Sequence, residues 1–194
     1  MKENNIKRDV LKIAVIGNSS VGKTTLRNTY LNIEFTEELL STVGYNKEET
    51  KITLEDGNSI KLVIWDTAGQ ERFQSMAVSA LKSSQGIILV FDLTNRKSFE
   101  DLDNWLQKVN DNSDKACLII FGNKSDLEDR QVTKEEAEKY AKDHNIPYLE
   151  TSAKLNKNIT EGFNKIANAA YKKFVIERGI SLSKKKKGGK KKCC

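Results

Sequence analysis

The sequence predicts an α/β fold built on a six-stranded, mostly parallel sheet, with one antiparallel edge strand and helices on both faces. Short apolar runs alternate with segments of helical period, which is the pattern of parallel strands covered on both sides. A glycine-rich turn joins the first strand to the first helix, and one Asp-Gly pair between two alternating segments predicts a hairpin. The chain of 194 residues, 38% of them hydrophobic, suits a single domain followed by a tail.

Six strands are expected from apolar or alternating runs that are bounded by turn residues. Asp56-Gly57 should connect the second strand to the third as a hairpin, which adds the antiparallel edge. The polar stretch from Asn32 to Tyr45 has no clear period and is long enough to be a functional loop. The expected strands span residues 11–16, 47–54, 60–65, 86–91, 117–121 and 147–151.

Five helical segments are expected between and after these strands. Thr133, with Glu136 three residues later, forms a capping box that starts the fourth helix. The last segment has apolar side chains along one face, so it should pack on the sheet. The expected helices span residues 25–31, a weak segment ending near 83, 98–109, 134–143 and 159–176.

The net charge of +6 belongs to the end of the chain, because seven lysines lie in the final eleven residues. Without them 26 basic residues face 27 acidic ones, a net charge of −1 for the rest. A nucleic-acid-binding domain would carry its basic face on the folded body, so no nucleic-acid partner is expected. With no apolar signal segment and no run near the ~20 residues of a membrane span, a cytosolic protein is expected. The domain should cover residues 10–178, between a flexible segment 1–9 and a disordered tail 179–194.

Eight residues after the first strand, from Gly17 to Thr24, spell G-x-x-x-x-G-K-T. The glycines let backbone N–H groups curl around phosphate oxygens, and the following helix adds the partial positive charge of its N-terminus. Lys23 can reach the outer phosphates, and the Thr24 hydroxyl can ligate Mg²⁺. The full match between a strand and a helix favours a nucleotide site over a chance glycine turn. The expected contact residues are Gly17, Ser19, Ser20, Val21, Gly22, Lys23, Thr24 and Thr25.

Further polar residues follow other strands, at the edge of a parallel sheet where ligands bind. Asp66 can hold the Mg²⁺ that Thr24 binds, through a water molecule; a lone Asp there would more often be a turn residue. Asn123-Lys124-Ser125-Asp126 places a carboxylate where it can accept from the N1–H and 2-amino group of guanine, a donor pair that adenine lacks. After the last strand, a backbone N–H of the segment Ser152, Ala153 and Lys154 could reach the guanine carbonyl.

Together these motifs resemble the Ras superfamily of small GTPases, and Trp65-Asp66-Thr67-Ala68-Gly69-Gln70-Glu71-Arg72-Phe73 resembles its Rab branch. The resemblance covers about residues 10–178 and all five nucleotide motifs. It implies the G-domain fold of P-loop NTPases and a GTP/GDP-regulated switch that hydrolyses GTP to GDP and phosphate. It also implies recruitment of effectors in vesicle trafficking, with an exchange factor and a GTPase-activating protein as regulators.

By this resemblance, Thr42 is the first-switch threonine, which binds Mg²⁺ only when the γ-phosphate is present. Phe35 should pack against the base, Gly69 should donate its N–H to the γ-phosphate, and Gln70 should orient the attacking water. Gln70, Lys23 and Thr42 are thus the expected catalytic set. No arginine supplied in cis is marked in the sequence, so intrinsic hydrolysis is expected to be slow and dependent on an activator.

Two segments that should face partners depart from the Rab pattern, residues 43–47 and residues 80–84, and Leu39 replaces a usual aromatic residue. This departure motivates an alternative, a guanine-nucleotide-binding scaffold with negligible turnover. A third class, an ATPase or kinase with the same phosphate loop, would prefer ATP to GTP.

The chain ends in Cys193-Cys194, which is similar to the double-cysteine ending of Rab proteins that carries two geranylgeranyl groups. One lipid of modest length binds membranes only marginally, and nearby lysines add roughly 1 kcal/mol each on an anionic leaflet. The ending implies anchoring to the cytoplasmic face of an endomembrane, with a soluble cytosolic pool extracted by a lipid-masking chaperone. Three segments resemble the late-endosomal Rabs: residues 73–75, 102–105 and 122–126.

Overall fold

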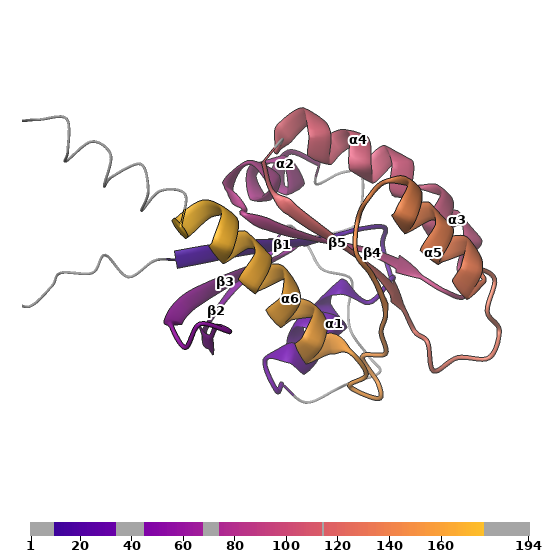
Figure 1. Ribbon diagram of the computed structural model, residues 1–194. Coiled ribbons are helices and arrows are strands. Elements are labelled where there is room, and N and C mark those ends of the chain that lie inside the picture. The colour runs from indigo at the N-terminus through magenta and orange to yellow at the C-terminus, as the bar shows by residue number, and fades with distance from the viewer. Residues whose placement is uncertain (1–9, 34–44, 68–73, 114, 177–194) are drawn as a thin grey trace, which may run out of the picture.

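The computed structural model describes residues 10–33, 45–67, 74–113 and 115–176. It contains a six-stranded sheet in the order β2-β3-β1-β4-β5-β6, and only the β2–β3 pair is antiparallel (Figure 1). The predicted fold class is therefore confirmed. The strands are β1 (Val10–Ile16), β2 (Tyr45–Thr53), β3 (Ser59–Thr67), β4 (Gly86–Asp92), β5 (Cys117–Asn123) and β6 (Tyr148–Glu150).

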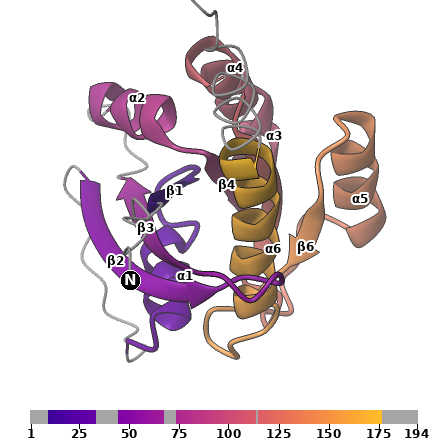
Figure 2. The same cartoon turned by 60° about the vertical axis from the view of Figure 1, so that its left-hand side comes forward.

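Helices cover both faces of this sheet (Figure 2). One face packs on α1 and α6, and the other on α2, α3, α4 and α5. β1 shows why the strands read as continuous apolar runs, since Ile13 and Val15 enter one core while Ala14 and Ile16 enter the other. The helices are α1 (Lys23–Tyr30), α2 (Gln74–Ser83), α3 (Arg96–Glu100), α4 (Leu102–Asn112), α5 (Lys134–Asp143) and α6 (Ile159–Tyr171), which continues as the π-helical turn η2 (Lys172–Ile176).

The local signals act where they were expected. In the β2–β3 hairpin Gly57 has φ 80°, and the Leu54 N–H donates to the Asn58 carbonyl at 2.9 Å. Thr133 caps α5 by accepting from the Glu136 N–H at 3.2 Å.

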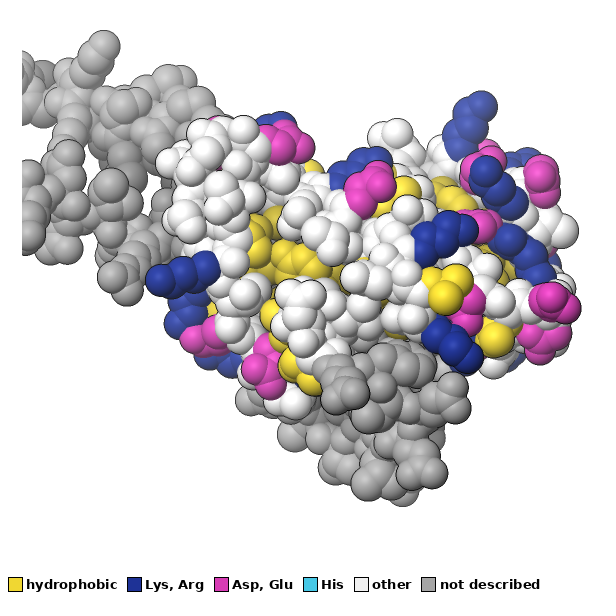
Figure 3. Space-filling model, turned by 90° about the horizontal axis from the view of Figure 1, so that it is seen from below, with side chains coloured by type: hydrophobic (Ala, Val, Ile, Leu, Met, Phe, Trp, Pro, Cys, Tyr) yellow, Lys and Arg dark blue, Asp and Glu magenta, His cyan; other side chains and the backbone are white. Residues whose placement is uncertain are grey.

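On the face seen in Figure 3, acidic and basic side chains are interspersed. Within the described ranges, no helix is both long and apolar enough to cross a bilayer.

The prediction of one helix over residues 98–109 is wrong, because the structure has two helices that meet at Asp101. Its ψ of −3° departs from helical geometry. The Asp101 carboxylate also accepts from the side chain of Asn18 at 2.7 Å, a contact across 83 residues of sequence. No pattern within the helix itself encodes that contact.

Residues 80–84, a segment expected to face partners, are only partly exposed. Ala80 and Leu81 are each 1% exposed, because α2 turns them into the core shared with β1 and β4. Ser84 is buried as well, and its hydroxyl donates to the Ala80 carbonyl at 2.7 Å. Lys82 and Ser83 are the residues of this segment that keep solvent access.

Candidate nucleotide site

The phosphate loop leaves β1 and enters α1 in a backbone shape that requires its glycines. Gly17 has φ 142°, and a Cβ there would lie 2.1 Å from the carbonyl oxygen of Val90 on β4. Gly22 has φ 93°, and its Cβ would lie 2.4 Å from Nδ2 of Asn123. Ser19 and Ser20 are exposed on this loop and Val21 is buried beneath it, so the loop presents polar groups outwards.

The Lys23 side chain folds back over the phosphate loop. Its side chain is buried, and Nζ donates to the carbonyl oxygens of Gly17 at 2.9 Å and Asn18 at 2.5 Å. Burial lowers the pKa of Lys23 to about 8, and the nearby negative charge of Asp66 partly opposes this. The ammonium is thus held by two neutral acceptors, which an anionic phosphate could replace.

Thr24 and Asp66 meet beneath the loop, as predicted for a metal site. The Thr24 hydroxyl donates to Asp66 Oδ2 at 2.6 Å, and the Asp66 side chain is fully buried. Burial raises the pKa of Asp66, against the opposing effects of Thr24, Arg27 and Lys23. Among the described residues, Asp66 Oδ1 has no hydrogen-bond partner. An oxygen pair with one unpartnered buried atom fits a hard cation such as Mg²⁺, directly or through water.

Arg27 contacts the same carboxylate, and the sequence reasoning missed it. It is 4% exposed, and Nη1 lies 3.4 Å from Asp66 Oδ2. The spacing could have revealed it, because residues three and four apart share a helix face and Arg27 follows Thr24 by three and Lys23 by four.

The guanine-type motif is joined to the phosphate loop by one buried side chain. Nδ2 of Asn123 donates to the Val21 carbonyl at 2.9 Å, and its Oδ1 accepts from the Thr151 hydroxyl at 3.2 Å. Asn123 at the end of β5 therefore holds together the turns that follow β1 and β6. Thr151 was another residue that the sequence reasoning missed.

Beside Asn123 the other motif residues are held individually. Asp126 Oδ1 accepts from the Ser152 hydroxyl at 2.5 Å, so these two predicted residues are brought together. Lys124, with φ 64°, forms an ion pair with Asp92 at the end of β4 at 2.6 Å. The carbonyl of Ala153 accepts from Thr29 of α1 at 3.2 Å. Thr25 lies on the first turn of α1, and Lys154 is exposed.

A second link ties the phosphate loop to α4. The Asn18 amide donates to Asp101 at 2.7 Å and accepts from the indole N–H of Trp105 at 2.7 Å. Trp105 is 7% exposed, and both hydrogen bonds of this link are partly buried. Both sides of the loop are therefore anchored by side-chain amides.

Other predicted residues lie outside the described part of the chain, so their positions add nothing to this geometry: Phe35, Thr42, Gly69, Gln70, Cys193 and Cys194.

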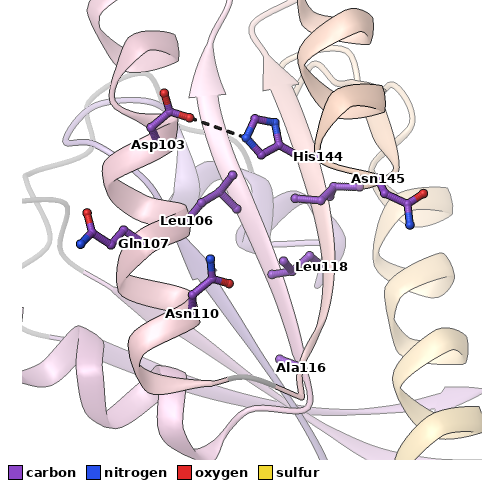
Figure 4. Close-up of a pocket in the computed structure, with 9 residues that line it drawn as sticks. Asp103, Leu106, Gln107, Asn110, Ala116, Leu118, His144 and Asn145 are labelled. Atoms are coloured by element: carbon purple, nitrogen blue, oxygen red, sulfur yellow. Dashed lines mark ion pairs between the residues drawn. The ribbon is translucent and has the colours of Figure 1, made fainter.

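A separate hollow of about 510 Å³ opens between α4 and the segment that follows α5 (Figure 4). Its lining mixes apolar side chains, such as Leu106 and Leu118, with polar ones, and Asp103 faces His144 at 3.9 Å. None of the predicted nucleotide residues lines it.

Lys23 should make stability depend on alkaline pH in the nucleotide-free protein. Below about pH 8 it is protonated in both the folded and the unfolded chain, so it contributes no slope. Between about pH 8 and 10.5 the unfolded chain binds more protons, so the free energy of unfolding should rise with pH. Each pH unit in this range adds about 1.4 kcal/mol to the free energy of unfolding. Between about pH 8 and 10.5, the free energy of unfolding of wild type should therefore rise by close to 3 kcal/mol more than that of Lys23→Met.

Urea unfolding of wild type, Lys23→Met and the exposed-site control Lys165→Met at several pH values measures this gain. Equal pH profiles for wild type and Lys23→Met would contradict the prediction.

Comparison with known proteins identifies the family of this chain. A family model described as Ras family matches residues 12–172. Ras-related protein Rab-8B of Homo sapiens is 43% identical over 160 residues, 81% of this chain and 77% of that protein. Rab-13 of Mesocricetus auratus is 41% identical over 160 residues, 81% and 78% of the two chains. SEC4 of Candida albicans is 35% identical over 198 aligned positions, 95% and 94% of the two. The chain belongs to the Ras family, within its Rab branch.

Proposed function

We propose that this Rab-branch GTPase binds GTP and GDP with Mg²⁺ at the carboxyl edge of its sheet and signals its nucleotide state to effectors on a membrane. The observation that carries the proposal is the Asn123 bridge, with Nδ2 2.9 Å from the Val21 carbonyl. This hydrogen bond holds the phosphate loop against the end of β5, three residues before Asp126, the carboxylate that would read guanine. GTP hydrolysis and a place in vesicle trafficking are general properties of the family.

The phosphate end of the site supplies positive charge. Lys23 exchanges the Gly17 and Asn18 carbonyls for phosphate oxygens, while the backbone N–H groups of the loop bind the others. Thr24 and Asp66, joined by Thr42 in the GTP state, would hold Mg²⁺, which neutralises charge between the outer phosphates. Gln70 orients the attacking water in line with the γ-phosphate, and the loop amides stabilise the charge that develops.

The base end of the site selects guanine. The Asp126 carboxylate accepts from N1–H and the 2-amino group, and the Ser152 hydroxyl at 2.5 Å fixes its orientation. The Ala153 N–H donates to the guanine carbonyl. Lys124 and Phe35 flank the base, and Lys154 closes the turn around it.

Switching follows from the γ-phosphate. Thr42 and Gly69 contact it only in the GTP state, so two surface segments take one arrangement with GTP and another with GDP. Effectors, an exchange factor and an activating protein would read or reset that state.

A second candidate, a guanine-nucleotide scaffold without useful turnover, is favoured by the atypical edge strand β2. There Asn46 and Lys47 are exposed, and Lys47 and Lys61 both form ion pairs with Glu49. Two lysines thus surround one exposed carboxylate on the edge strand whose first residues depart from the Rab pattern.

Hydrolysis separates these two candidates. Gln70→Leu should slow single-turnover GTP hydrolysis at least about tenfold in the presence of cell extract, because the attacking water loses its orienting group. Gln107→Leu replaces an exposed glutamine on α4 and serves as the matched control, with wild-type turnover expected. Equally slow phosphate release by wild type and Gln70→Leu would support the scaffold instead.

Base selection is tested at Asp126. Asp126→Asn should weaken GTP binding roughly 10- to 100-fold, because the amide cannot accept both guanine donors. It should favour xanthine nucleotide, whose second carbonyl can accept from that amide. Asp129→Asn, an exposed position in the same turn, should leave competitive nucleotide binding unchanged. Displacement of GDP by ATP as readily as by GTP would point to an ATPase or kinase.

The tail, residues 179–194, is proposed to carry geranylgeranyl groups on Cys193 and Cys194, beside the lysine run, and to be extracted by a lipid-masking chaperone. Cys193→Ser with Cys194→Ser should move the protein from the membrane pellet to the supernatant, because neither lipid can be attached. The Cys117→Ser variant, at the start of β5, controls for loss of a thiol. Continued pelleting of the double variant would remove the lipid proposal.

The late endosome is the proposed compartment, to be checked by imaging against organelle markers.

A further inference from the structure

We propose that Arg27 is a built-in counter-cation for Asp66, which keeps the buried carboxylate paired without a divalent cation and so reduces the dependence of GDP retention on Mg²⁺. The inference rests on the proposed function, because it assigns Mg²⁺ to Thr24 and Asp66. It adds a positioning residue that the nucleotide motifs do not contain.

The geometry isolates the pair from water. Arg27 is 4% exposed and Asp66 is 0% exposed, with 3.4 Å between Nη1 and Oδ2. The rest of the guanidinium is held sideways by Asn28, whose Oδ1 accepts from Nε at 3.1 Å and from Nη2 at 2.7 Å. Nη1 has no hydrogen-bond partner among the described residues, so it meets the carboxylate through charge alone.

A buried carboxylate without a counter-charge is strongly unfavourable. Thr24 donates a single hydrogen bond to Asp66, and Lys23 directs its ammonium to the carbonyls of Gly17 and Asn18. Within the described ranges, Arg27 is the cation that forms an ion pair with Asp66. The guanidinium therefore supplies, from inside the chain, the charge that a metal would otherwise bring.

The same charge opposes the metal. Lys23, Arg27 and Asp66 sum to +1, whereas a neutral residue at position 27 would leave a sum of 0. Arg27 therefore repels an added divalent cation, whereas it attracts phosphate oxygens. Coupling between two interactions at one group is reciprocal. Mg²⁺ binding weakens the Arg27–Asp66 ion pair by some factor, and Arg27 therefore weakens Mg²⁺ binding by the same factor.

Release of fluorescent GDP from the full chain tests this coupling, with free Mg²⁺ varied from excess EDTA to millimolar. The ratio of the release rate in EDTA to that in Mg²⁺ should be at least about tenfold larger for Arg27→Met than for wild type, which corresponds to roughly 1.4 kcal/mol of coupling. Arg27→Lys, which keeps the charge, should retain a ratio near that of wild type. Arg96→Met removes an arginine paired with Glu100 and Glu136 away from the site, and should also keep the wild-type ratio.

Thermal unfolding of the GDP complex gives a readout that does not depend on turnover. Chelation should lower the melting temperature of Arg27→Met more than that of wild type, and should affect Arg96→Met as it affects wild type. If Arg27→Met folds only with Mg²⁺, the inference is supported. If it folds in neither condition, Asn28→Ala decides: freeing the guanidinium toward Asp66 should raise the half-saturating Mg²⁺ concentration, and an unchanged value would overturn the inference.

Two outcomes separate the role of Arg27 from the proposed nucleotide binding. If wild type retains no GDP at any Mg²⁺ concentration, the proposed function fails. If GDP is retained and Mg²⁺ slows its release equally, within about twofold, in wild type and Arg27→Met, the role of Arg27 fails alone.

Discussion

The side-chain amide of Asn123 is the interaction on which the rest of the site depends. It donates to the Val21 carbonyl and accepts from Thr151, so the turns after three strands share one buried group. A Cβ at Gly22 would lie 2.4 Å from the same amide, which leaves room only for glycine in the loop. Asn123 thereby ties the phosphate loop to the end of β5, three residues before Asp126, the carboxylate proposed to read the base.

The sheet itself could be predicted because its strands are buried on both faces, and continuous apolar runs are then their only stable composition. Capping of α5 by Thr133 and the Asp56-Gly57 turn were equally local and were confirmed. The break at Asp101 could not be predicted, because Asn18 contacts it from 83 residues away. The spacing within α1 places Arg27 on the same face as Lys23 and Thr24, but its contact with Asp66 depends on the position of β3 beside α1, which the helix sequence alone does not give.

The site also concentrates charges that cost stability. Lys23, Arg27 and Asp66 are each at most 6% exposed, and their partners within the described ranges are carbonyls, an amide, a hydroxyl and one another. Buried charges are retained at such a cost where a ligand will use them. A polyanionic nucleotide would place further negative charge beside Lys23 and Arg27, whose two positive charges exceed the single negative charge of Asp66.

The link between Asn18 and Trp105 has an optical consequence. The indole N–H of Trp105 donates directly to the phosphate loop at 2.7 Å, and Lys108 lies 4.4 Å above the ring centroid. Indole emission responds to hydrogen bonding and to nearby charge, and the chain has only two tryptophans. Trp105 is therefore a natural fluorophore in contact with the loop, through which events at the phosphates could be followed in the unlabelled protein.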